Sequence, residues 1–223
     1  MIFCVFTLAA DSSHRPRGVR IDCRNILMKM FFEGLSKGGR KLLRPVARRS
    51  DFCRWNGIAC DPSYEIQEIS YRNFDNWGNF NIHAVPPTTL NLEISQCRQT
   101  FHMDMRMLPR NLQYVNLSNN QITGILDLIV LPEKIQQFIV ENNLLTGYIN
   151  LTNLPRTLQA LNVGKNKIQQ RTVYYDDLPD RLGHVTLVMD YGKEHIYQVR
   201  ALDPARAEPN RLTFPHFPKD HVH

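Results

Sequence analysis

Cysteine and histidine are the residue types in this 223-residue chain that could carry covalent or metal chemistry. Three histidines gather in the C-terminal tail and could bind a metal weakly, but a solvated tail is the favoured reading: His216, His221 and His223. Cys53 has no histidine partner that the sequence identifies, and the Gly-rich phosphate loop and the GxSxG and HExxH motifs are absent. We therefore predict a protein without catalytic residues, cofactor or metal site.

Five cysteines are an odd number, so a complete disulfide framework does not follow from their count. They are Cys4, Cys23, Cys53, Cys60 and Cys97. The role of each cysteine therefore depends on the elements that position it.

The chain repeats itself with a period of 23 residues. The repeats begin at Pro62, Val85, Leu108, Leu131 and Leu154, and a partial sixth begins at Leu178. The repeats at Leu108 and Leu131 match position for position and contain L-x-x-L-x-L-x-x-N-x-L, the signature of a leucine-rich-repeat solenoid. We predict an α/β-type leucine-rich-repeat solenoid with a short curved parallel β-sheet of about six strands, an extended convex side and an N-terminal capping helix.

An asparagine ends the strand portion of three repeats, at Asn120, Asn143 and Asn166. A buried side-chain amide can satisfy both donors and acceptors of the backbone where the chain turns inward. Cys97 and Phe74 take this position in the two preceding repeats. We expect Cys97 to be a buried structural thiol, and we expect the turn at Phe74, which cannot hydrogen-bond, to depend on the cap.

The segment before the repeats predicts one helix and a basic connector. Apolar residues at 27, 28, 31, 32 and 35 have helical spacing, and Gly34, Gly38 and Gly39 are expected to end the helix. Residues 37–50 then form a basic connector in which Pro45 excludes a continuous helix. The opening apolar stretch is too short to span a bilayer, which needs about 20 residues. A truncated signal peptide and a plain disordered terminus both remain open for it.

The string from Cys53 to Cys60 follows the pattern C-x-W-x-G-[IV]-x-C, with Trp55 and Gly57 at its fixed positions. It resembles the N-terminal cap of plant-type leucine-rich-repeat proteins, which are found on receptor ectodomains and on related surface proteins of protists. The resemblance extends from about Asn25 to Leu187. It implies a helix over the first repeat, a Cys53–Cys60 disulfide with the tryptophan packed beneath it, and an asparagine ladder. It also favours a secreted or cell-surface protein over a cytoplasmic one.

Two alternatives to the disulfide stay open on the residues alone. Cys53 and Cys60 could be reduced and packed beside Trp55, because Cys4 and Cys23 leave the redox compartment undetermined. A zinc site is the weaker alternative, because the spacing lacks a second ligand pair.

We divide the chain into five segments. They are a leader or disordered segment (1–23), the N-terminal cap (24–61), the repeats (62–190), a closing strand (191–203) and a disordered tail (204–223). Residues 190–193 form a good turn sequence, so we expect residues 183–200 to hold a last strand and a returning strand. The tail has four prolines and no periodicity, so we expect it not to pack.

Charge is unevenly distributed along the chain. Residues 1–50 hold 11 basic against 3 acidic residues, a surplus of 8, whereas residues 51–223 hold 16 against 18. Because the basic residues lack interleaved aromatics, we do not predict a nucleic-acid surface.

The concave face of the sheet is the surface left for function, and we expect it to bind a protein or peptide. Residues between the inward-facing strand positions should face solvent there. The candidate partner-binding residues are Glu68, Arg72, Glu93, Tyr114, Asn116, Ile139 and Glu141. An exposed Tyr114 beside an exposed Ile139 is typical of interface anchors, although such residues can also simply keep a sheet soluble.

A second hypothesis is a structural or assembly role, in which the basic N-terminal segment docks on an anionic surface such as RNA or lipid. Asn116-Leu-Ser and Asn150-Leu-Thr are also glycosylation acceptors by pattern, a match that arises often by chance.

Overall fold

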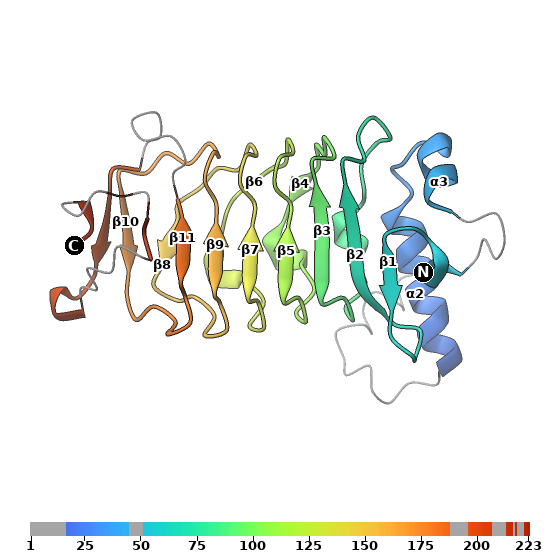
Figure 1. Ribbon diagram of the computed structural model, residues 1–223, viewed down its shortest axis with the longest axis horizontal. Helices are drawn as coiled ribbons and strands as arrows, with labels where there is room; N and C mark the ends of the chain where they lie inside the picture. Colours follow the sequence, from blue (N-terminus) through green and yellow to red (C-terminus); the bar gives the residue numbers. More distant parts are fainter. Residues whose placement is uncertain (1–16, 45–50, 188–195, 207–212, 216, 218–220) are drawn as a thin grey trace.

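The computed structural model describes residues 17–44, 51–187, 196–206, 213–215, 217 and 221–223 of the chain. Seven strands form one sheet that runs along the molecule (Figure 1). In spatial order they are β1 (Ile58–Cys60), β2 (Ile66–Arg72), β3 (Asn91–Ser95), β5 (Tyr114–Asn116), β7 (Gln137–Ile139), β9 (Ala160–Asn162) and β11 (His184–Thr186). The six strands from β2 to β11 are parallel, which confirms the predicted solenoid, and β1 adds an antiparallel edge at the cap.

Inward-facing residues of successive strands lie side by side and build the core. Five consecutive register pairs join one fully buried row of Ile69, Leu92, Val115, Phe138, Leu161 and Val185. Leu117, Val140 and Val163 form a second row with no exposed surface. Because each repeat buries its apolar side chains against its neighbours, the stack is stable only as a whole.

The convex side consists of short turns and short strands, as the sequence predicts. Its 3₁₀ turns are η3 (Ile82–Ala84), η4 (Met105–Met107) and η5 (Leu128–Val130). Its strands are β4 (His102–Met103), β6 (Thr123–Gly124), β8 (Asn150–Leu151), β10 (Thr172–Tyr175) and β12 (Gln198–Ala201). Each 3₁₀ turn starts after a capping side chain that accepts a backbone N–H two residues later; the caps are Asn81, Asp104 and Asp127.

The described part of the cap contains two α-helices where the sequence predicts one. Helix α2 (Arg17–Phe31) begins seven residues before the expected start at Arg24. Helix α3 (Lys37–Leu43) lies where the sequence predicts a connector, and Ser36 caps it by accepting from the Gly39 N–H. The prediction that Gly38 and Gly39 end a helix is therefore wrong.

Gly38 and Gly39 pack closely against Trp77, which explains why glycine occurs inside this helix. A Cβ atom at Gly38 would lie 2.7 Å from Cζ3 of that indole ring, and one at Gly39 would lie 2.8 Å from its Cβ. The two glycines thus allow α3 to approach the first repeat. The rest of the predicted connector, 45–50, and residues 1–16 of the predicted leader lie outside the described residues.

The Cys53–Cys60 disulfide is present and joins η2 (Phe52–Arg54) to β1. Trp55 is buried, with its ring 4.6 Å from that of Phe32 in a stacked arrangement. Arg24 of α2 is also buried, and its Nη1 donates to Cys53 Sγ and to the Tyr64 carbonyl. The helix, the disulfide and the first strand therefore form one unit.

Aromatic packing replaces the missing amide in the first turn. Phe74 lies against Tyr71, Trp77 and Phe80, with ring centroids 5.8 to 6.2 Å apart. Phe80 in turn stacks on Phe31 of α2. The first turn depends on the cap, as the sequence predicts.

The asparagine ladder is present in the three later repeats. In each, the side-chain Nδ2 of Asn120, Asn143 or Asn166 donates to three backbone carbonyls, and Oδ1 accepts at least one backbone N–H of the preceding repeat. Cys97 is buried, and its Sγ lies 3.1 Å from the Ser95 carbonyl oxygen. Cys97 is therefore buried as predicted, and this burial raises the pKa of its thiol to about 11.

The C-terminal end differs from the predicted returning strand. Strand β12 pairs in parallel with β10, and β10 pairs with β8, so β12 extends the convex side. The expectation that the tail does not pack is wrong for Phe214 and Phe217, which are both buried. Phe214 lies 5.7 Å from Tyr175 between ring centroids, so it covers the last turns. The predicted turn at 190–193 and His216 lie outside the described residues, and η6 is Pro204–Arg206.

Candidate interaction surface on the concave sheet

Register pairing arranges the outward side chains of the concave sheet into rows that cross the strands. The first row contains Glu68, Asn91, Tyr114, Gln137, Ala160 and His184. The second contains Ser70, Glu93, Asn116, Ile139, Asn162 and Thr186. Arg72 and Ser95 begin a third row. Neighbours within a row are about 4.8 Å apart across the strands, so they can act on one bound segment together.

A hollow lies at the N-terminal end of this face, over β2, β3 and β5. It has a volume of about 340 Å³ and is lined by Glu68, Ile69, Arg72, Asn91, Glu93 and Tyr114. Four of the seven residues predicted from the sequence therefore line one concavity. Its floor is rigid because each lining residue belongs to a paired strand.

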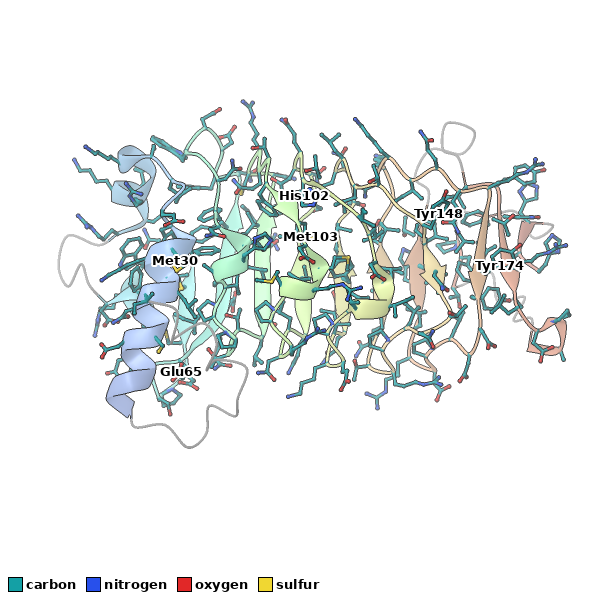
Figure 2. The ribbon with its side chains drawn as sticks, turned by 180° about the vertical axis from the view of Figure 1, so that it is seen from behind. Met30, Glu65, His102, Met103, Tyr148 and Tyr174 are labelled. Carbon is teal, nitrogen blue, oxygen red and sulfur yellow. A yellow bond between two sulfur atoms is a disulfide. The ribbon has the colours of Figure 1, made fainter. Side chains whose placement is uncertain are left out.

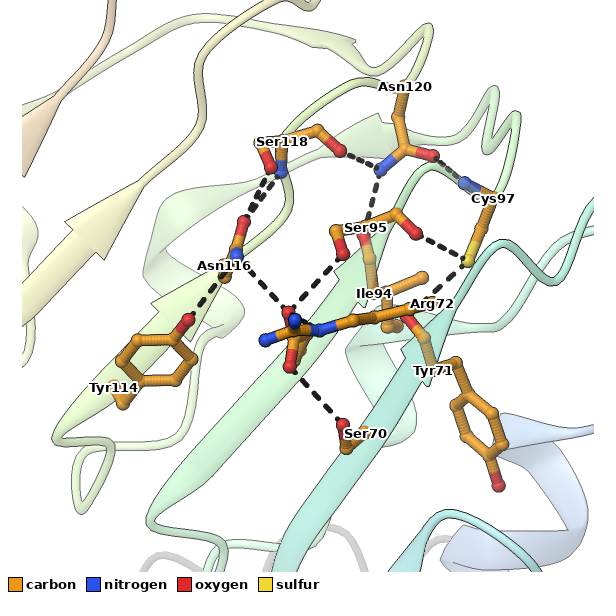
Figure 3. Close-up of polar contacts among 11 residues, drawn as sticks. Ser70, Tyr71, Arg72, Ile94, Ser95, Cys97, Tyr114, Asn116, Ser118 and Asn120 are labelled. Atoms are coloured by element: carbon orange, nitrogen blue, oxygen red, sulfur yellow. Dashed lines mark hydrogen bonds and ion pairs between the residues drawn. The ribbon is translucent and has the colours of Figure 1, made fainter.

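Glu93 is the centre of a hydrogen-bond network in this hollow, and Figure 3 labels its partners. Its carboxylate accepts from Arg72 Nε at 2.5 Å, Ser70 Oγ at 3.2 Å, Ser95 Oγ at 3.3 Å and Asn116 Nδ2 at 3.2 Å. The strand pattern predicts that Glu93 faces solvent, but the residue is only 7% exposed and is therefore buried. A buried carboxylate persists only when it is paired and hydrogen-bonded, and these four donors meet that requirement.

Arg72 presents a fixed positive charge above this network. The hydrogen bond and the charge of Glu93 together raise the pKa of the guanidinium. Its side chain is 65% exposed, so much of it faces solvent while Nε holds Glu93. The pair therefore places a partly buried anion and an accessible cation at the same edge of the hollow.

Asn116 links Glu93 to Tyr114, the aromatic residue that lines the hollow. Its Nδ2 donates to Glu93 and to the Tyr114 hydroxyl, each at 3.2 Å. Its Oδ1 accepts from both the hydroxyl and the backbone N–H of Ser118, at 2.7 and 3.1 Å. The amide is thus fully engaged, and the Tyr114 ring is held against the hollow.

The two remaining predicted residues lie farther along the sheet. Ile139 pairs in register with Asn116 and is half-buried, so it continues the second row beyond the hollow. Glu141 follows β7, and its carboxylate accepts from Asn162 Nδ2. The structure therefore joins four predicted residues by hydrogen bonds, namely Arg72, Glu93, Asn116 and Tyr114, and places Glu68 in the lining of the same hollow. Ile139 lies on the neighbouring strand β7, and Glu141 follows that strand.

Ser70 and Ser95 belong to the Glu93 network but are not among the residues predicted from the sequence. Both donate a hydroxyl hydrogen bond to Glu93, and for Ser70 this contact depends on the register between β2 and β3. An acidic residue flanked by serines in its own and the preceding repeat is the sequence signal that could have pointed to this network.

The network offers fixed donors, acceptors and an aromatic face, which suit noncovalent recognition. Within the described residues no three His, Cys, Asp or Glu side chains gather as a set that could hold a metal ion. No helix in the described part of the chain is both long and apolar enough to cross a bilayer.

Known structures share this architecture. The ectodomain of the Arabidopsis receptor kinase HAESA, solved with a peptide hormone, matches with a TM-score of 0.50 and 14% identity, over 81% of this chain and 34% of that one. This chain folds as a leucine-rich-repeat solenoid. Pollen Receptor Kinase 3 matches with a TM-score of 0.56 and 15% identity, over 81% and 94%. A plant ice-binding protein matches with a TM-score of 0.53 and 17% identity, over 79% and 56%.

No protein-family model and no curated protein sequence matches this chain. At such low identity the matched structures establish the fold alone. Because receptors and an ice-binding protein share it, function has to be argued from the site.

Proposed function

We propose that this protein is a non-catalytic recognition module that binds a peptide, or an extended segment of a protein, on its concave face. The observation that carries the proposal is the hollow over β2, β3 and β5, in which a buried Glu93 fixes Arg72 and Asn116. Groups held in place before binding lose little entropy when a ligand arrives. Tyr114 supplies the aromatic surface on which interface energy often concentrates.

The charges of the face favour a ligand with a basic side chain. The rows hold two carboxylates, Glu68 and Glu93, against one guanidinium, Arg72, and Glu141 adds a third carboxylate just after β7. Because Arg72 is paired with Glu93, the exposed Glu68 carboxylate is the free charge of the hollow. A lysine or arginine of the ligand can meet Glu68 while its stem lies against Tyr114.

The structural comparison supports this choice of ligand class. The HAESA ectodomain was solved in complex with a peptide hormone, so the solenoid architecture can hold a peptide. The Cys53–Cys60 disulfide supports a secreted or cell-surface protein, because such bonds persist in oxidising compartments.

Peptide display tests the proposal directly. A library of random peptides is panned against the immobilised chain, and enriched peptides are titrated by calorimetry against wild type and two variants. The concave variant is Tyr114→Ala/Ile139→Ala/Glu141→Ala. We expect it to bind about 10-fold more weakly or worse, because truncating an anchor costs more than about 1 kcal/mol.

The convex side offers a control of the same composition, Tyr148→Ala/Ile125→Ala/Glu133→Ala. Tyr148, Ile125 and Glu133 are exposed, so this variant should bind as wild type does. Glu68→Gln should weaken peptides with a basic residue and leave neutral peptides unchanged. Equal loss in both triple variants, or loss in the convex one alone, would place the site elsewhere.

The alternative assembly role, in which the basic N-terminal segment docks on RNA or lipid, stays a prediction. Its test needs charge substitutions in place of a deletion of residues 1–50. Met28, Phe31 and Phe32 are buried in the core, so a deletion would remove the cap together with the charge.

A further inference from the structure

The two glycosylation patterns of the chain lie in opposite environments. Asn116 is on β5 in the concave sheet, and Asn150 is on β8 in the convex sheet. We propose that Asn150 carries an N-linked glycan in the secreted protein and that Asn116 does not. The attached group is an oligosaccharide joined through N-acetylglucosamine.

Asn116 is excluded by the contacts of its amide. The nitrogen that would carry the sugar donates to Glu93 and to Tyr114, and the oxygen accepts two bonds from Ser118. A glycan on Nδ2 would replace one of its two hydrogens, so either the buried Glu93 or the Tyr114 hydroxyl would lose its bond to Asn116. Molecules modified there would lose a stabilising network, so we expect folded protein to have a bare Asn116.

Asn150 faces away from the core. Its neighbour Leu151 has no exposed surface, and successive residues of a strand point to opposite sides, so the Asn150 side chain points outward. Its Oδ1 accepts from the Thr152 N–H at 3.0 Å, which links the two residues of the acceptor pattern in a tight turn. Among the described residues no hydrogen bond engages its Nδ2.

The surroundings of Asn150 leave space for a large group. Tyr174, its register partner on β10, is 43% exposed, and Tyr148 is 76% exposed. Figure 2 shows both tyrosines on the back of the solenoid, toward its C-terminal end. A glycan on this side would leave the concave hollow free, so modification and ligand binding are compatible.

The chemistry needs an activated sugar donor from the cell, a lipid-linked pyrophosphate oligosaccharide. Asn150 Nδ2 attacks C1 of the first sugar; the new N–C1 bond forms as the C1–O bond to pyrophosphate breaks. The amide loses one proton, and the lipid pyrophosphate leaves. This transfer takes place in the oxidising compartment that also supports the Cys53–Cys60 disulfide.

The test is expression of the full chain behind a secretory signal in a eukaryotic cell. The secreted protein is weighed by mass spectrometry before and after peptide N-glycosidase F, and the modified residue is located by peptide mapping. Two hydroxyl substitutions, Thr152→Ala and Ser118→Ala, each remove one acceptor pattern and keep its asparagine.

We expect one glycan at Asn150, its loss in Thr152→Ala and in Asn150→Gln, and no change in Ser118→Ala. Protein that is secreted without a glycan, or with one at Asn116, would overturn the proposal. Circular dichroism of the secreted variants confirms that each is folded, so loss of the glycan cannot be attributed to misfolding.

Discussion

The asparagine ladder gives a prediction that the structure makes quantitative. Asn120 connects two repeats: its Oδ1 accepts the backbone N–H groups of Cys97 and Gln99, both at 3.0 Å. Its Nδ2 donates to the carbonyls of Ile94, Leu117 and Ser118. The substitution Asn120→Leu keeps a similar volume and removes all five bonds.

The two N–H groups account for most of the expected loss. Leu117 O also accepts from Asn143 Nδ2, and Ser118 O also accepts from the Gln96 N–H, so both carbonyls keep a partner. The Cys97 and Gln99 N–H groups would lose the acceptor that holds them. At about 1 to 3 kcal/mol for each unsatisfied buried donor, Asn120→Leu should lower the free energy of unfolding by about 2 to 6 kcal/mol.

Equilibrium urea unfolding measures this loss. Far-UV circular dichroism follows the sheet, and fluorescence follows Trp55 in the cap and Trp77 in the first repeat, so coincident transitions verify two-state unfolding. The control is Asn153→Leu, because Asn153 is exposed; its effect should stay within about 0.5 kcal/mol. A loss below about 1 kcal/mol for Asn120→Leu would refute the assignment of the ladder as a requirement of the turns.

Two further predictions concern the cysteines. Replacing Cys53 and Cys60 by serine should lower the stability by about 2.5 kcal/mol, the loop-closure entropy of an eight-residue loop, and a melting curve that matches that of the oxidised protein would contradict it. Burial raises the pKa of Cys97 to about 11, whereas a cysteine in the unfolded chain has a pKa of about 8.5. The protonated thiol therefore contributes stability to the fold at neutral pH. That contribution is lost as the pH rises from about 8.5 to 11. At pH 8, in a Cys4→Ser/Cys23→Ala background, the thiol should react with Ellman's reagent on the order of 100-fold more slowly in the folded than in the unfolded chain, and equal rates would show that it is accessible.

The core could be predicted from the sequence because its determinants recur every 23 residues. Leu117, Val140 and Val163 follow one another at that period, and the structure buries all three. Each follows directly after a strand and continues its inward and outward alternation, and its neighbour is the equivalent residue of the next repeat. The ladder residues Asn120 and Asn143 can be predicted in the same way, because they also recur at a spacing of 23 residues.

The candidate site was predictable only as a surface. The strand pattern assigned Glu93 to the exposed side, but the structure buries it among Arg72, Ser70 and Asn116. These donors come from the two neighbouring repeats. Which of them reach the carboxylate depends on strand register and on rotamers, and neither is contained in a repeat pattern.

The ends of the solenoid were the least predictable parts. Gly38 and Gly39 weaken a helix in isolation, yet α3 forms because Ser36 caps it and Trp77 packs against it. Strand β12 and the buried Phe214 likewise depend on the open convex end that β10 presents to them.

The sequence by itself determined the architecture: a stack of 23-residue turns with leucines inside, amides at the turns and a cap at the N-terminal end. It left the state of Cys53 and Cys60 open, and the structure shows their disulfide. The tertiary structure alone decided which polar side chains meet in a hollow, how the two ends are covered, and which of the two glycosylation patterns lies outside the Glu93 network. The physical reason is the range of the forces involved. Alternation and burial act between adjacent turns, so the residues that provide them recur in the sequence every 23 residues. Contacts that a single side chain makes across repeats or at the ends do not recur, so the repeat pattern does not predict them.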